Sequence, residues 1–177
     1  TAALRKAIID RLERMIGVTY TDAQISVGSG AKHVIFTALM ATLSPGEEVI
    51  IPAPYWVSYP DMTLLNDGVP VIVQCPMADD FKLTPERLRD AITPKTRVVY
   101  VESPVNPTLG LLDLAGIAAV LARVNRRRSK DRRVLFLVDN TFATPLGQRP
   151  LELGADLVVS SLTKHLSGFG TDLGGMV

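Results

Sequence analysis

VLFLVDNTF, residues 134–142, and LVVSSLTKH, residues 157–165, are the two stretches that decide the fold. Each opens with a largely apolar run, at 134–138 and at 157–160, which is typical of a strand buried on both faces of a sheet. Polar residues follow each run directly. We therefore predict a carboxylate, hydroxyl groups and a lysine amine at the ends of two strands.

Outward from these stretches, strand and helix patterns alternate along the chain. Apolar runs predict further strands at residues 25–27, 48–51, 69–73 and 97–101, with another beginning at 175. Helical patterns cover residues 2–16, 31–43, 55–66, 85–92 and 112–126, and none begins directly after Asp139. This alternation requires crossover connections. We therefore expect an α/β fold, a three-layer sandwich with a mostly parallel sheet of about seven strands.

Composition and charge argue against several classes of protein. The net charge of +1 creates no field that favours nucleic acid or an acidic membrane, and we expect neither as a partner. Cys75 is the one cysteine, so an internal disulfide is excluded, and we expect a cytoplasmic protein. One cysteine and two histidines argue against a dedicated metal site. The basic run at 126–133 lacks interleaved aromatic residues, and we interpret it as a solvated turn.

Lys164 and Asp139 carry the strongest chemical signal. Most lysines lie on a solvated surface, but Lys164 follows an apolar strand and hydroxyl residues. Asp139 ends an apolar strand without a clear helix to cap. Pyridoxal 5'-phosphate needs an amine that forms a Schiff base and an acid that pairs with its pyridine nitrogen. We predict Lys164 as the catalytic residue and Asp139 as a cofactor-binding residue.

The turn at residues 28–32 joins a strand to a helix, and free backbone N–H groups at a helix start bind phosphate. An ordinary turn between a strand and a helix has the same composition. A dinucleotide site is disfavoured because His33 takes the place of the third glycine and no acid ends the next strand. The residues predicted to bind phosphate are Ser29, Gly30, Ala31, Lys32, Ser161 and Thr163.

Two loops after strands supply further candidates. Tyr55 and Trp56 follow one strand, where aromatic residues are usually core but where a ring can also stack on a flat heterocycle. Asn106 lies between two prolines, and its amide either stabilises that turn or points at the phenolic oxygen of the cofactor. The residues by themselves leave both alternatives open.

With these motifs in place, the chain resembles the fold-type I pyridoxal-phosphate enzymes over essentially its whole length. Residues 1–97 look like class I aspartate-type aminotransferases, in the stretches VGSGAK (27–32), PGEEVII (45–51), PYWVSYP (54–60) and LTPE (83–86). From residue 98 onward the chain is more similar to the family of cystathionine synthases, cystathionine lyases and methionine lyases. The stretches that carry this second likeness are ESPVNP (102–107), VDNTF (138–142), QRPLELGAD (148–156) and SLTK (161–164).

The resemblance implies a role for each candidate residue. It implies that Lys164 holds the cofactor as a Schiff base and that Asp139 contacts the pyridine nitrogen. It also implies that Asn106 lies near the ring hydroxyl and that Thr141 lies beside the ring. The residues that it implies in phosphate binding are Ser161, Thr163, Gly30 and Ala31.

Four positions bear on the type of reaction. The aminotransferase pattern places Trp56 against the cofactor ring, whereas the tyrosine of the sulfur enzymes aligns with either Tyr55 or Trp56. Aminotransferases of this class carry a tyrosine where this chain has Phe142 and an arginine where it has Asp172. Both departures favour the sulfur-enzyme family in the half that holds the lysine.

We therefore expect a pyridoxal-phosphate enzyme that acts on a small-molecule amino-acid substrate. The first hypothesis for its reaction is elimination or replacement at sulfur amino acids. Transamination of the aspartate type is the second hypothesis. A catalytically inactive scaffold fragment is the third and belongs to another class. The resemblance implies a homodimer or homotetramer. It also implies that residues 1–177 are a cofactor-binding large domain without the family's N-terminal arm and C-terminal small domain.

Overall fold

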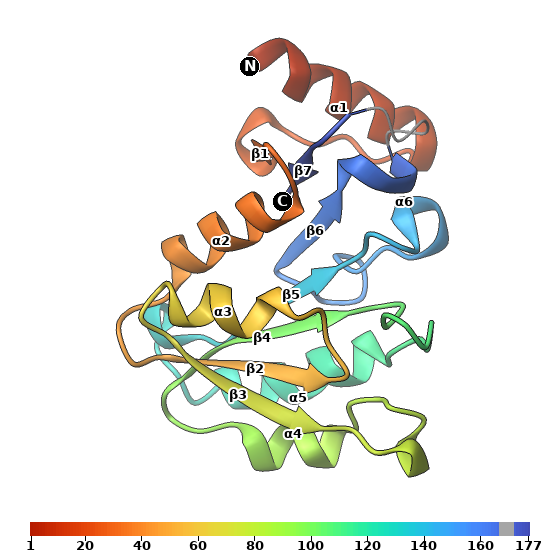
Figure 1. The fold of residues 1–177 in the computed structure, drawn as a ribbon. Coiled ribbons are helices and arrows are strands. Elements are labelled where there is room, and N and C mark those ends of the chain that lie inside the picture. The colour runs from red at the N-terminus through yellow and green to blue at the C-terminus, as the bar shows by residue number, and fades with distance from the viewer. Residues whose placement is uncertain (167–171) are drawn as a thin grey trace.

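A computed structural model describes residues 1–166 and 172–177 of the chain. One sheet of seven strands runs through them in the order β1-β7-β6-β5-β4-β2-β3 (Figure 1). The five strands β2 to β6 are all parallel to one another, and β7 is antiparallel to both of its neighbours, β1 and β6. The predicted α/β fold with a mostly parallel sheet is confirmed. The strands are β1 (Val27–Gly28), β2 (Glu48–Ala53), β3 (Val69–Gln74), β4 (Thr96–Glu102), β5 (Leu135–Asp139), β6 (Leu157–Ser161) and β7 (Gly175–Met176).

Helices cover both faces of the sheet, with α2 and α3 on one side and α4 and α5 on the other (Figure 1). The α-helices are α1 (Ala2–Ile16), α2 (Ala31–Thr42), α3 (Ser58–Leu64), α4 (Pro85–Ala91), α5 (Leu114–Asn125) and α6 (Thr144–Gly147). Short 3-10 helices are η1 (Asp22–Gln24), η2 (Met77–Asp79) and η3 (Lys130–Arg132), and η4 (Leu162–Leu166) is a π-helical turn. In the part of the chain described, no helix has the length and apolarity that a bilayer crossing needs.

Strand alternation divides the core into two layers. Neighbouring residues on a strand point to opposite faces of the sheet. On β4, Tyr100 packs with the buried cluster under α2 and α3, whereas Val99 and Val101 pack with the cluster under α4 and α5. A third cluster joins Leu12 of α1 to Met176 of β7. The layer under α2 and α3 is the one that carries polar side chains at the carboxyl ends of β4, β5 and β6.

Several element bounds differ by one to three residues from those expected, as in β1, which was expected at 25–27, and two differences concern helices near the site. The helix expected over 55–66 begins only at Ser58. Pro60 explains the later start, because proline is tolerated in the first turn of a helix but removes a hydrogen bond in its interior. A four-residue helix, Thr144–Gly147, also forms near Asp139, where none was expected. It begins five residues further on, with Pro145 in its first turn, and Asp139 does not cap it.

Candidate active site

The predicted site residues gather at one edge of the sheet. Parallel strands bring their last residues to the same edge, and ligands of open α/β sheets bind beyond it. Glu102 is the last residue of β4, Asp139 of β5 and Ser161 of β6. Lys164 follows three residues after Ser161, within η4. The two stretches that decide the fold therefore end beside each other, as predicted.

Asp139 is a buried carboxylate surrounded by hydroxyl and amide donors. Its side chain belongs to a residue that is only 5% exposed. The hydroxyls of Tyr59 and Tyr100 donate to Oδ2, at 3.4 and 3.2 Å. Burial raises the pKa of the Asp139 carboxyl, and its hydrogen-bond donors partly oppose that rise. None of the donors described for this carboxylate carries a positive charge, so the site is suited to a cationic ligand group.

Thr141 connects Asp139 to the end of β6. Its backbone N–H donates to Oδ1 of Asp139 at 3.0 Å, which is the local turn that an aspartate commonly forms. Its Oγ1 accepts from the backbone N–H of Ser161 at 2.9 Å. The turn and the predicted site role of Asp139 are therefore compatible, because the turn uses Oδ1 and leaves Oδ2 facing the tyrosines.

The start of α2 lies against β7. A Cβ added to Gly175 would stand 2.5 Å from the backbone of both Gly30 and Ala31, so only glycine fits at this position. Gly175 is also the register partner of Ser161. Thr163 is fixed nearby, because its Oγ1 accepts from the N–H of Gly174 at 3.1 Å. The helix start and both hydroxyl residues therefore lie around one short segment of β7.

Ser29, Lys32, Tyr55 and Trp56 lie at the rim of this edge. The N–H of Ser29 donates to Nδ1 of His33 at 3.2 Å, so the turn before α2 is internally braced. Nζ of Lys32 lies 6.0 Å from the ring centroid of Trp56, at the outer limit of a cation–π contact. Trp56 is 45% exposed, whereas Tyr55 lines a narrow crevice together with Tyr59 and Glu102. Which ring stacks on the cofactor stays a prediction.

Lys164 and Asn106 occupy loops at the same edge. Lys164 is exposed, and its backbone angles of φ −97° and ψ −137° interrupt the helical path of η4. Asn106 is half-buried in the turn after β4, and its backbone lies near enough to the carboxyl group of Glu102 to lower the pKa of that group. The structure thus places Asn106 beside a second acid, and the contact of its side-chain amide with the cofactor remains a prediction.

Sequence reasoning missed three residues beside Asp139, namely Tyr59, Tyr100 and Glu102. The rings of Tyr59 and Tyr100 pack with centroids 4.4 Å apart, and burial raises the pKa of both phenols. Burial, followed by the charge of Asp139, raises the pKa of Glu102 to about 7. Residues 98, 100 and 102 share one face of β4, and a tyrosine and a glutamate on a buried strand face were the available signal.

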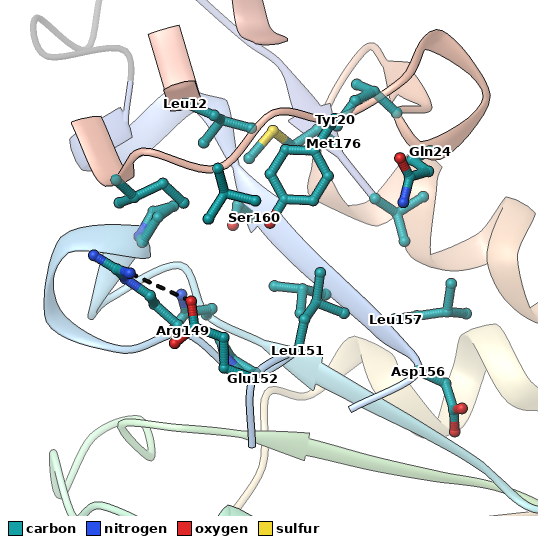
Figure 2. Close-up of a pocket in the computed structure, with 18 of the residues that line it drawn as sticks. Leu12, Tyr20, Gln24, Arg149, Leu151, Glu152, Asp156, Leu157, Ser160 and Met176 are labelled. Atoms are coloured by element: carbon teal, nitrogen blue, oxygen red, sulfur yellow. Dashed lines mark hydrogen bonds and ion pairs between the residues drawn. The ribbon is translucent and has the colours of Figure 1, made fainter. Parts of the chain in front are cut away.

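A cavity of about 570 Å³ lies elsewhere, between α1, β7 and the segment that follows α6. Figure 2 shows Leu12, Tyr20 and Met176 on one side of it and Arg149 opposite. Ser160 lines this cavity, and Ser161, the next residue along the strand, points to the other face. The cavity is therefore separate from the candidate active site.

The donor set at the sheet edge fits pyridoxal phosphate. A buried carboxylate whose described hydrogen-bond donors are uncharged hydroxyl and amide groups suits a protonated pyridine nitrogen. The first N–H groups of α2 have no acceptors within the helix, and with the hydroxyls of Ser161 and Thr163 they suit a phosphate. An amine for the aldehyde is present in Lys164.

Fold and site together define a fold-type I pyridoxal-phosphate domain. Residues 5–177 match the family described as "Cys/Met metabolism PLP-dependent enzyme", and the chain belongs to this family. The predicted family and its cofactor, pyridoxal 5'-phosphate, are confirmed.

Proteins similar to this chain include aminotransferases. The chain is 54% identical over 117 residues to an aspartate/prephenate aminotransferase of Cereibacter sphaeroides, covering 66% of this chain and 29% of that protein. It is 36% identical over 184 residues to an aspartate aminotransferase of Rhizobium meliloti, covering 98% and 44%.

Solved structures agree with these sequence matches. The aspartate aminotransferase of Rhizobium meliloti superposes with a TM-score of 0.79 at 35% identity, over 98% of this chain and 45% of that one. An aromatic aminotransferase from Pyrococcus horikoshii gives a TM-score of 0.82 at 28% identity, over 100% and 49%. The chain thus spans less than half the length of these relatives.

Proposed function

We propose that this protein uses pyridoxal phosphate to transfer an amino group between an amino acid and a keto acid. The match to an aspartate aminotransferase over 98% of the chain is the observation that carries this proposal. It favours the second of the three hypotheses drawn from the sequence. An aspartate-like or aromatic amino acid is the substrate class that the names of the relatives suggest.

Asp139 and Lys164 are the residues assigned to the chemistry of the cofactor. When bound, the cofactor supplies a carbonyl carbon that reacts with amines and a ring that withdraws electrons from the substrate α-carbon. Asp139 is assigned the pyridine nitrogen, because a carboxylate there keeps that nitrogen protonated. Nζ of Lys164 is assigned two tasks: it holds the carbonyl carbon at rest, and it moves the α-proton during turnover.

The remaining candidate residues are assigned to binding. Backbone N–H groups at the start of α2 and the hydroxyls of Ser161 and Thr163 are assigned the phosphate. Thr141 and Asn106 are assigned the ring and its hydroxyl. One aromatic ring, Tyr55 or Trp56, is assigned to the exposed ring face, where it excludes water. Ser29 and Lys32 are assigned to the phosphate end of the site.

Elimination or replacement at a sulfur amino acid is the second candidate function. Two residues of the lysine-bearing half favour it, Phe142 and Asp172, which take the places of a tyrosine and an arginine in the aminotransferase pattern. Up to removal of the α-proton, both reactions place the same demands on Lys164 and Asp139. They differ in what leaves afterwards, so analysis of the products separates them.

The deciding experiment incubates the purified protein and cofactor with amino acids in two series. Transamination gives stoichiometric transfer of the amino group from aspartate or an aromatic amino acid to a keto acid. Elimination gives a keto acid, ammonia and a thiol from a sulfur amino acid. A protein that gains no cofactor absorbance and forms neither set of products would be an inactive scaffold, and both enzyme proposals would then be wrong.

Attachment of the cofactor is tested by borohydride reduction and peptide mapping. The proposal expects one labelled peptide, with the label on Lys164. The Lys164→Ala variant is expected to carry no label, whereas Lys95→Ala, which removes an exposed lysine before β4, is expected to label as the wild type does. A label on any other lysine contradicts the assignment.

We also propose that residues 1–177 form the large domain of a longer enzyme that works as a homodimer or homotetramer. Superposition over nearly the whole of this chain but under half of each relative supports the domain assignment. Native mass spectrometry of the protein purified from its source tests both points. An intact mass near 19.2 kDa would contradict the proposal.

A further inference from the structure

Glu102 and Asp139 form a pair of carboxyl groups at the active-site edge. They are register partners on β4 and β5, so their side chains point to the same face of the sheet. Adjacent strands lie about 4.8 Å apart, which brings the two side chains within electrostatic reach. Oε2 of Glu102 is buried and has no hydrogen-bond partner among the residues described. A buried carboxyl oxygen of this kind is stable when protonated and unfavourable when charged.

Among the residues described, the groups around Glu102 supply no compensating positive charge. Asp139 faces it from β5, Tyr100 from β4 and Tyr59 from α3, and Tyr55 lines the same crevice. All four are acids or phenols. The backbone N–H of Asn106 is the contact that favours the ionised form. A cation that arrives at Asp139 is therefore the event that changes the balance at Glu102.

We propose that Glu102 is a positioning residue that releases its proton to solvent when a cationic group binds at Asp139, so that cofactor binding and proton release are coupled. This inference rests on the proposed function, because the pyridine nitrogen is the cation that it invokes. It assigns Glu102 a role that acts through Asp139, without contact to the cofactor. The ionised pair then presents two negative charges where the single Asp139 charge stood before.

The size of the effect follows from the position of Glu102 on the pH scale. With a pKa of about 7 in the cofactor-free protein, half of the Glu102 carboxyls carry a proton at pH 7. A neighbouring positive charge lowers that pKa. Complete ionisation then releases about 0.5 proton per bound cofactor at pH 7, and almost none at pH 9, where Glu102 is already ionised.

Isothermal titration calorimetry of pyridoxal phosphate into the protein measures this release. Titrations at pH 7 in buffers of different ionisation enthalpy give the number of protons exchanged. The cofactor, Lys164 and Asp139 are present in wild type and variant alike, so the difference between them measures the proton release that depends on Glu102. Glu102→Gln is expected to release about 0.5 proton fewer than the wild type. Glu86→Gln, which alters an exposed glutamate on α4, is expected to match the wild type.

Equal proton release by Glu102→Gln and the wild type overturns the role of Glu102 and leaves the proposed function intact. A wild type that binds no cofactor defeats the proposed function and this inference with it. If Glu102→Gln does not fold, a carboxyl ¹³C NMR titration of the wild type decides the question. A Glu102 midpoint that cofactor does not lower overturns the coupling.

Discussion

Asp139→Asn is expected to make the cofactor-free protein more stable and to weaken cofactor binding. Burial raises the pKa of the Asp139 carboxyl, so the charged form is unfavourable in the folded protein at neutral pH. Asparagine has nearly the same shape and keeps an oxygen that accepts from the N–H of Thr141. Its amide N–H groups can donate to the hydroxyl oxygens of Tyr59 and Tyr100. The substitution therefore removes the buried charge and keeps the local hydrogen bonds.

Loss of that charge acts in the opposite direction on binding. A hydrogen bond to a charged partner contributes about 1.5–3 kcal/mol. Without the carboxylate, the affinity for pyridoxal phosphate is expected to fall about 10- to 150-fold. Thermal unfolding of the cofactor-free protein and a cofactor titration followed by absorbance measure the two effects on one preparation.

Asp156→Asn is the matched control. Asp156 lies directly before the first residue of β6, whereas Ser161 and the candidate site lie at the other end of that strand. Its carboxylate accepts from the N–H of Phe136 at 2.9 Å and pairs with Arg133 at 3.6 Å. This control is expected to lose stability slightly and to bind cofactor normally. The reasoning about Asp139 is refuted if Asp139→Asn binds cofactor as tightly as the wild type, or if its cofactor-free form unfolds at a lower temperature.

Three further predictions follow from single contacts. Gly175→Ala is expected to lower the free energy of unfolding by about 1–3 kcal/mol, because the added Cβ meets the backbone at the start of α2. Gly147→Ala is the control and is expected to be tolerated, because its Cβ would lie 3.4 Å from the nearest atom. Urea denaturation of both variants measures the difference. Thr141→Val is expected to lower stability by about 1–3 kcal/mol, because the N–H of Ser161 loses its acceptor; stability equal to the wild type would contradict this. The pKa of Glu102 is raised from 4.5 to about 7, so the folded state holds the proton more tightly and wild-type stability falls as the pH rises across that interval. After allowance for partial exposure, the fall is about 2 kcal/mol, and denaturation at several pH values is expected to show a flatter profile for Glu102→Gln.

The candidate site divides into a part that the sequence indicated and a part that it did not. Asp139, Ser161 and Lys164 were predicted because they lie at or shortly after the ends of two apolar runs, and the edge of a parallel sheet collects such residues. Thr141 was predicted only through the family resemblance. The bounds of the helix that begins at Ser58 were less accurate. Aromatic and proline residues before it have no strong period, and the position of Pro60 decided where the helix starts.

Local sequence determined the order of strands and helices, because apolar period and turn residues act over a few neighbouring positions. It also determined which polar groups follow the strands, and through its motifs the family and the cofactor. Only the tertiary structure decided which groups meet. The hydroxyls of Tyr59 and Tyr100 reach Asp139 from 80 and 39 residues away, and β7 inserts between β1 and β6 so that Gly175 touches the start of α2. These contacts depend on the spatial order of the strands and on which face each side chain takes, and neither follows from the spacing of residues within one strand.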